Sequence, residues 1–311
     1  MSSRLGFGCA PILGRVGKKE SLRALSAAYA HGITHFDVAR SYGFGEAEAL
    51  LGEFLADKRG NVTITTKFGI VPPRNSTALS LAKGFARRCI KRMPGGRAMV
   101  HAVSKAALSQ RNYDVAYART CLEASLRHLR VEQVDYYLIH EPPKPDELTE
   151  ELQRFLEDMQ AAGKIRKWGL TADTREMLET PVARDAQVVL QEANLNVLDN
   201  LTLDTPGDKV RFLSRPYGGG PESLVASAEQ QAVRQAVQML GLDDLNHHEI
   251  SMFFALSLAG DSGKVIASMF SENHIRENVA LAERYVSAAD QARQLAPAIL
   301  RNAHSGQRQL A

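Results

Sequence analysis

The sequence predicts an α/β protein of the (β/α)8 TIM-barrel class, with residues 1–311 forming a single domain. Short apolar runs rich in β-branched residues alternate with longer segments of helical periodicity, which is the pattern of parallel βαβ units. Eight such runs are present, and 311 residues fall within the size range of one barrel. The first run continues as Cys-Ala-Pro-Ile-Leu-Gly and lacks the G-x-G-x-x-G fingerprint of an open dinucleotide-binding sheet. A closed barrel is therefore favoured.

The eight predicted strands share length, apolar character and β-branched content. They are Leu5–Cys9, Thr34–Val38, Val62–Lys67, Val134–Ile139, Ile165–Thr171, Gln187–Gln191, Lys209–Leu213 and Lys264–Ser268. Amphipathic helices with apolar residues three and four apart are predicted between them. Examples are Lys18–His31, Asp114–Leu129, Glu147–Ala161, Pro221–Leu240 and His247–Ala259.

One connection, Val71–Asn112, is too long for an ordinary loop between a strand and a helix. Residues 72–112 hold nine Lys or Arg and no Asp or Glu, so the other 270 residues sum to −6 against a total of +3. We expect a basic insertion at the C-terminal mouth of the barrel, with an amphipathic helix beginning after Ser76. It is either a solvated surface element or a lid that attracts anionic substrate or cofactor phosphate. Binding of a membrane surface or a partner is a weaker alternative.

The composition is that of an ordinary globular protein, with 44% hydrophobic and 23% charged residues. A net charge of +3 is too small to indicate nucleic-acid binding. No stretch reaches the ~18 apolar residues of a spanning helix, so stable membrane insertion is not expected. Cys9, Cys89 and Cys121 lack the spacing of a metal or disulfide framework. These features predict free thiols, no metal site and a cytoplasmic location, and they carry no signal for an oligomeric state.

Four reactive side chains fall at or just after the ends of predicted strands, where a barrel places its catalytic groups. Asp37 and Tyr42 lie in HFDVARSYG, Lys67 in TITTKFG, and His140 in DYYLIHEPP. Singly each could be structural, but together they suit reduction of a carbonyl, which needs a proton donor and hydrogen bonds to the oxygen. We expect Tyr42 to be the general acid and base, with its pKa lowered by Lys67. Asp37 would orient Lys67, and His140 would donate a second hydrogen bond.

The motifs FDVARSYG, TTKFG, DYYLIHEPP and GKIRKWGLTAD resemble, in that order, those of the aldo-keto reductase superfamily. The resemblance extends from LGFGCAP at residues 5–11 to ENHIREN at residues 272–278. It implies a catalytic tetrad of Asp37, Tyr42, Lys67 and His140. It also implies NADP(H) as the cofactor, bound across the barrel mouth, a small-molecule carbonyl or alcohol as substrate, and no metal.

The resemblance also implies a set of cofactor-binding residues. Thr171 and Gln191 match positions that hold the carboxamide, although Ala172 stands where the family has Asn. Ser214 stands where a tyrosine stacks on the nicotinamide, and Arg215 or Tyr217 could substitute for it. In the last predicted helix, Glu277 and Asn278 match the adenine-binding positions. Ser268 and His274 replace the Lys and Arg that bind the 2′-phosphate, so NAD(H) use is also possible and discrimination should be poor.

Two other functions are compatible with the sequence. A barrel aldolase or isomerase could form a Schiff base on Lys67, and in the aldolase case the protein would be a lyase. A nicotinamide-binding regulatory or scaffold barrel could turn over slowly, and Ala172 and Ser214 would support that alternative.

Overall fold

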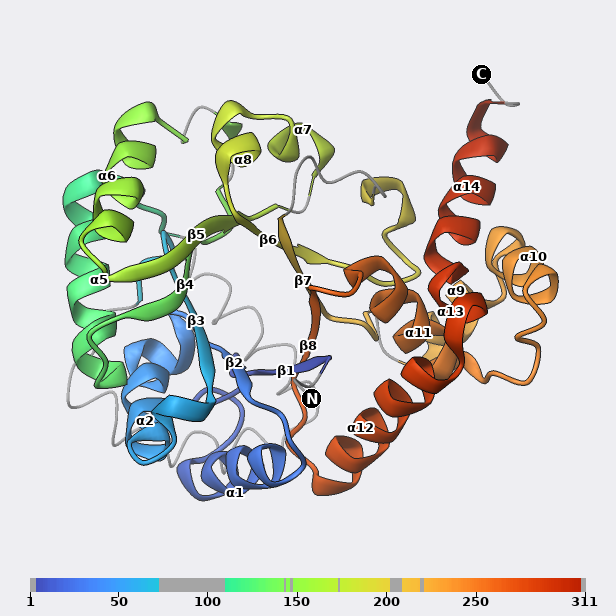
Figure 1. Cartoon of the computed structure of the whole chain (residues 1–311), viewed down its shortest axis with the longest axis horizontal. Coiled ribbons are helices and arrows are strands. Elements are labelled where there is room, and N and C mark those ends of the chain that lie inside the picture. The colour runs from blue at the N-terminus through green and yellow to red at the C-terminus, as the bar shows by residue number, and fades with distance from the viewer. Residues whose placement is uncertain are drawn as a thin grey trace, which may run out of the picture.

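The protein forms a closed parallel barrel with the strand order β1-β2-β3-β4-β5-β6-β7-β8 (Figure 1). The computed structural model describes residues 4–72, 110–142, 144–145, 148–172, 174–201, 209–218 and 221–308. The strands are β1 Leu5–Gly8, β2 His35–Asp37, β3 Thr63–Phe68, β4 Val134–Ile139, β5 Ile165–Thr171, β6 Val188–Glu192, β7 Val210–Ser214 and β8 Lys264–Ala267. The predicted fold class is therefore confirmed, and each predicted strand overlaps an observed one.

The barrel interior and the layer under the helices are separate apolar clusters, because successive side chains of a strand point to opposite faces. The interior cluster consists of Leu138, Val188, Leu190, Phe212 and Ile266, with Tyr136 and Val210 against it. The larger cluster includes Phe7, Phe36, Val189, Leu213 and Val265, which lie on the other face of their strands and pack under the helices. This alternation decides which residue at each strand end faces the barrel mouth.

Helices surround the barrel (Figure 1). They are α1 Lys18–Ala30, α2 Ala47–Leu55, α5 Val115–Leu129, α6 Glu150–Ala161, α7 Arg175–Leu178, α8 Pro181–Asp185, α9 Pro221–Ala228, α10 Gln231–Met239, α11 His247–Ala259, α12 Glu272–Ser287, α13 Ala289–Arg293 and α14 Leu295–Arg308. Short 3-10 turns are η1 Tyr42–Gly45, η2 Arg59–Asn61 and η4 Leu198–Asn200. No helix in the described ranges is both long and apolar enough to cross a membrane.

The predicted helix Pro221–Leu240 is in fact two helices. Gln230 has an extended backbone, with φ −58° and ψ 141°, which ends the helical hydrogen bonding between α9 and α10. Apolar periodicity continues through both helices, so the break has no signal in the pattern.

The two ends of the insertion are held together at the C-terminal end of β3. Ile70 forms an antiparallel bridge with Arg111. The amide of Val71 donates to the Gln110 carbonyl at 3.0 Å, and the amide of Asn112 donates to the Gly69 carbonyl at 2.8 Å. The segment thus leaves and re-enters the barrel close to Lys67. The helix predicted after Ser76, and Cys89, lie outside the described residues, whereas Cys9 and Cys121 are buried free thiols.

Candidate active site

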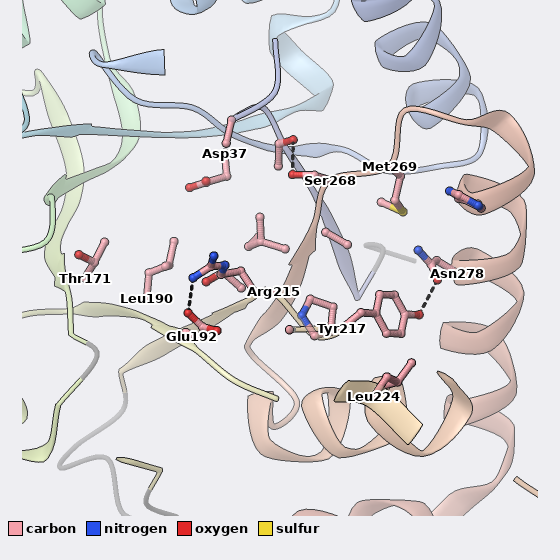
Figure 2. A pocket seen from close by; sticks show the side chains of 18 of the residues that line it. Asp37, Thr171, Leu190, Glu192, Arg215, Tyr217, Leu224, Ser268, Met269 and Asn278 are labelled. Carbon is pink, nitrogen blue, oxygen red and sulfur yellow. Dashed lines mark hydrogen bonds and ion pairs between the residues drawn. The ribbon is translucent and has the colours of Figure 1, made fainter. Parts of the chain in front are cut away.

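A pocket of about 1610 Å³ opens at the C-terminal ends of the strands. It runs from the side chains at the ends of β2, β3 and β4 to the first turns of α12, as Figure 2 shows between Asp37 and Asn278. Small-molecule sites usually have volumes of roughly 300–1,000 Å³, so this pocket has room for a substrate together with a larger ligand. Asp37, Tyr42, Lys67 and His140 all line one end of it, which we call the catalytic end.

Lys67 and Asp37 form a buried ion pair at the base of the catalytic end. The Lys67 ammonium lies 2.7 Å from both carboxylate oxygens of Asp37 and donates to the Val38 carbonyl at 3.0 Å. Lys67 is 1% exposed. Burial alone would lower the pKa of Lys67, but the charge of Asp37 and the Tyr42 oxygen raise it above its usual value. The lysine is therefore a fixed cation.

Tyr42 begins η1, and its hydroxyl lies 3.5 Å from the Lys67 ammonium. The next residue, Gly43, has φ +58°, and a Cβ there would lie 2.7 Å from the Ile12 carbonyl oxygen. Glycine at this position lets the loop after β2 pack against the loop after β1. Burial raises the pKa of Tyr42 to about 12, and the charge of Lys67 opposes this shift. The expectation of a lowered pKa was therefore wrong, because desolvation outweighs the nearby cation.

His140 follows β4 and faces Tyr42 across the site. The two ring centroids are 5.8 Å apart, with an interplanar angle of 78°. Burial and then the charges of Lys67 and Arg111 hold the pKa of His140 well below its usual value. A neutral imidazole has one N–H to donate, so His140 can give a hydrogen bond to an oxygen placed between it and Tyr42.

The residues predicted to hold the carboxamide differ in position. Thr171 lines the pocket and accepts a hydrogen bond from the Glu141 amide at 2.6 Å. Gln191 is buried and does not line the pocket, whereas Leu190 and Glu192 do. The side-chain alternation of β6 turns Gln191 away from the mouth, so Glu192 is the polar side chain that β6 offers to a ligand. Gln191, which was expected to hold the carboxamide, therefore does not line the pocket, whereas Glu192 does.

The end of β7 contributes three side chains to the pocket. The Ser214 hydroxyl donates to the Gln191 carbonyl at 3.2 Å. Arg215 has a left-handed backbone, with φ +58°, and pairs with Glu192 at 2.5 Å (Figure 2). Tyr217 donates to the Asn278 side chain at 2.7 Å, and its ring lies 5.4 Å from that of His248. Of the two suggested substitutes for a stacking tyrosine, Tyr217 thus lies against α12, and Arg215 lies beside the end of β6.

The far part of the pocket, which we call the α12 end, contains the remaining predicted residues. Ser268, His274, Glu277 and Asn278 all line it. Asn278 is buried, but His274 and Glu277 are exposed on the helix surface. Arg276 does not line the pocket. Among the described residues of α12 that line the pocket there is no lysine or arginine, and His274 is the basic side chain that this helix contributes.

Sequence reasoning missed several charged residues of the pocket. Arg15, Arg111, Glu141 and Glu192 line it and were not assigned to it. Alternation along β6 places Glu192 on the same face as the interior residues Val188 and Leu190, but the sequence does not show which face is interior. The other three follow strands in loops, where side-chain direction has no fixed period.

Comparison with known proteins agrees with this architecture. The family model described as "Aldo/keto reductase family" matches residues 4–204. A "6-dehydroglucose reductase" of Novosphingobium aromaticivorans is 29% identical over 244 residues, covering 70% of this chain and 66% of that protein. A "Probable aldo-keto reductase 1" of Glycine max is 28% identical over 177 residues, covering 54% of this chain and 41% of that protein. The chain thus matches less than two thirds of the length of either curated relative.

Solved structures share the fold. An aldo-keto reductase from Bacillus halodurans in its holo form has a TM-score of 0.62 at 16% identity, covering 97% of this chain and 92% of that chain. One from Klebsiella pneumoniae in complex with NADPH has a TM-score of 0.54 at 18% identity, covering 90% and 85%. Because the family model matches well over half of the residues, the chain belongs to the aldo/keto reductase family.

Proposed function

We propose that this protein is an oxidoreductase that reduces an aldehyde, ketone or sugar carbonyl to the alcohol. Its cofactor is NADP(H), and it discriminates only weakly against NAD(H). The observation that carries the proposal is the arrangement of Tyr42 beside the Lys67–Asp37 pair and opposite His140, at one end of a pocket of about 1610 Å³. The curated relatives are named reductases, and one structural neighbour was solved with NADPH, which supports the same reaction class.

When bound, a reduced nicotinamide would supply the hydride that adds to the carbonyl carbon. Tyr42 would donate its hydroxyl proton to the carbonyl oxygen, and the neutral His140 would stabilise the developing negative charge with a hydrogen bond. Lys67 would stabilise the phenolate that the transfer leaves. With a pKa raised to about 12, Tyr42 is protonated at neutral pH, which is the form that can donate a proton in the reduction.

The residues of the pocket are chemically suited to a nicotinamide dinucleotide. Thr171, Glu192 and Ser214 offer acceptors and donors for a carboxamide next to the catalytic end. Arg215 offers a cation for a phosphate, and the backbone N–H groups that begin α12 offer an anion site. Glu277 and Asn278 would bind the adenine.

The Schiff-base alternative is disfavoured by the state of Lys67. A lysine nucleophile must be neutral and free to approach a carbonyl. The Lys67 ammonium is instead directed at Asp37 and Val38, and its pKa is raised. Substrate trapped on Lys67 by borohydride, with no change in cofactor, would reverse this conclusion.

The decisive experiment follows the absorbance of NADPH and NADH with a panel of aldehydes, ketones and sugars. Turnover dependent on a carbonyl supports the proposal. Tight cofactor binding without turnover across the panel would favour a regulatory or scaffold barrel. We further propose that residues 1–311 act as one barrel domain, in the cytoplasm.

A further inference from the structure

Glu141 has an unusual backbone at the catalytic end. Its φ is +48°, in the left-handed region that few residues other than glycine adopt. Its amide donates to Thr171 at 2.6 Å, and the Tyr113 hydroxyl lies 2.7 Å from its carbonyl oxygen and 2.9 Å from that of His140. Strained residues held in this way cluster at functional sites. The contacts fix the Glu141 carboxylate at the pocket edge, 3.9 Å from the His140 imidazole.

Tyr113 reaches these carbonyls because Gly69 leaves space for its ring. A Cβ on Gly69 would lie 2.3 Å from the Tyr113 ring, and Gly69 itself has φ +118°. Gly69 and Tyr113 belong to the two paired ends of the insertion. These paired ends, residues 69–71 and 110–113, are called the stem of the insertion. The stem therefore positions the segment that carries His140 and Glu141.

Arg111, in the same stem, pairs with Glu141. Its guanidinium lies 3.2 Å from the carboxylate, and the two side chains are 27% and 50% exposed. Arg111 lines the pocket and is close enough to His140 for its charge to contribute to the lowered pKa of that imidazole. Partly exposed pairs of this kind contribute little to stability, so a ligand anion can replace the carboxylate at little cost.

Arg15 is a second arginine of the same pocket. It lies in the loop after β1, which packs on Gly43 next to Tyr42, and it lines the same pocket. Its side chain is exposed, and the described residues give it no acidic partner within 4.0 Å. Of the Lys and Arg side chains that line the pocket, Lys67, Arg111 and Arg215 each pair with a carboxylate, whereas Arg15 has no such partner among the described residues. Arg111 supplies positive charge next to the place where the carbonyl would bind, since its charge acts on His140.

We propose that the substrate is an anionic carbonyl compound, carrying a carboxylate or phosphate that binds Arg111 and Arg15 while its carbonyl meets Tyr42 and His140. Glu141 is the internal counter-ion, which Arg111 leaves when the substrate binds. The inference rests on the proposed function, whose hydride transfer fixes where the carbonyl lies. It makes Arg111, Arg15 and Glu141 determinants of substrate specificity rather than catalytic residues.

The test compares kcat/KM for 4-oxobutanoate with that for butanal, which has the same chain length and no charge. The wild-type protein should prefer the anion, and the preference should decrease with ionic strength. Arg111→Gln and Arg15→Gln should each lower the ratio of anion to neutral substrate by about tenfold, as expected for one charged hydrogen bond. Glu141→Gln should raise the ratio, because it removes the competing anion. Arg111→Lys should retain most of the preference, and Arg23→Gln, on the outer surface of α1, is the matched control.

Equal or better use of butanal by the wild-type protein would overturn the inference, as would arginine variants that slow both substrates by the same factor. Calorimetric titration with succinate measures the affinity of the proposed anion site without requiring turnover. Weaker succinate binding by Arg111→Gln and Arg15→Gln supports the site. No succinate binding by the wild-type protein contradicts it. Absence of turnover with every carbonyl would count against the proposed function instead.

Discussion

The catalytic end and the α12 end of the pocket hold their polar side chains in different ways. At the catalytic end, Asp37, Lys67 and His140 are at most 5% exposed and come from the ends of three neighbouring strands. At the α12 end, His274 and Glu277 stand on the exposed surface of a helix. The first arrangement depends on the barrel itself, whereas the second can change without disturbing the strands.

This difference separates two tasks. Proton transfer requires groups held within hydrogen-bond reach of one oxygen, and a buried ion pair provides that rigidity. Choice between two phosphorylation states of a cofactor requires only a cation near one phosphate. We therefore expect substitutions at the catalytic end to have large effects on turnover and stability, and substitutions at the α12 end to have modest effects on affinity.

The largest effect should follow Tyr42→Phe. The variant lacks the proton donor but keeps the Lys67–Asp37 pair, so turnover should fall by about 10²–10⁴, the usual loss for a general acid. NADPH binding, measured by quenching of protein fluorescence, should remain close to wild type. Tyr29→Phe, on α1 and outside the pocket, is the matched control. Turnover near the wild-type value in Tyr42→Phe would exclude Tyr42 as the acid.

Lys67→Met should damage both stability and the pH profile. Removing one partner of a buried pair leaves the Asp37 carboxylate without a counter-ion, which typically costs about 3–5 kcal/mol in the free energy of unfolding. The lost cation should also raise the pKa of Tyr42, so the alkaline rise of alcohol oxidation should move to higher pH.

The double variant Asp37→Asn, Lys67→Met separates these two effects. It removes both charges, so it should recover much of the stability lost by Lys67→Met while remaining slow. Urea denaturation and initial rates measure the two quantities. If the double variant were no more stable than Lys67→Met, the unpaired Asp37 charge would not be the cause of the lost free energy of unfolding.

Much of the catalytic end could be predicted from the sequence, because Asp37 and Lys67 lie within predicted strands and His140 immediately follows one. Their convergence follows from the barrel topology alone. The side-chain direction of Gln191 could not be predicted from the end of a strand whose register was uncertain, since one residue of shift exchanges the two faces. The predicted direction of the Tyr42 pKa shift was also wrong, because desolvation depends on packing that no local motif encodes.

The Arg111–Glu141 pair illustrates a second limit. Its members are 30 residues apart in the chain. They meet because Tyr113 holds a left-handed backbone at Glu141. Position 141 is not one of the residues, such as Gly or Asn, that usually indicate this conformation in a sequence. Here a long-range contact stabilises a backbone conformation that the local sequence does not favour. Prediction from local sequence is expected to fail at such positions.

Acid should destabilise the protein through its buried histidines. His35 is fully buried in the barrel, with its two ring nitrogens 2.9 Å and 3.3 Å from the hydroxyls of Thr63 and Thr65. Burial, and then the charges of Lys264 and Lys67, hold its pKa well below 6.5. Below about pH 6.5 the unfolded chain binds a proton that the folded chain does not, so stability is lost as pH falls toward the folded pKa.

Each such histidine contributes a slope of up to about 1.4 kcal/mol per pH unit to the free energy of unfolding. His35→Gln should reduce this slope between pH 6.5 and 5, as measured by urea denaturation. An identical slope in His35→Gln and the wild-type protein would show that His35 is protonated in the folded state.

The smallest expected effect concerns the choice between NADPH and NADH at the α12 end. Ser268 donates to the Gly8 carbonyl at 3.0 Å and packs tightly on β1, since a Cβ on Gly8 would lie 2.8 Å from its hydroxyl. A lysine there would disturb the barrel, so His274→Arg is the cleaner test. It adds one charge-assisted contact to a 2′-phosphate and should raise the preference for NADPH by up to about tenfold.

The wild-type preference should itself stay below ~10²-fold, because Ser268 and His274 replace two cationic contacts. The measurement is kcat/KM for both cofactors with one good substrate, and Arg276→Gln is the matched control, since Arg276 lies outside the pocket and bonds to Asn273. A wild-type preference of a thousandfold or more, unaffected by His274→Arg, would mean that other residues bind the phosphate. Cofactor choice would then depend on defined phosphate contacts, much as proton transfer depends on defined groups at the catalytic end. The proposed difference between the two ends would not hold.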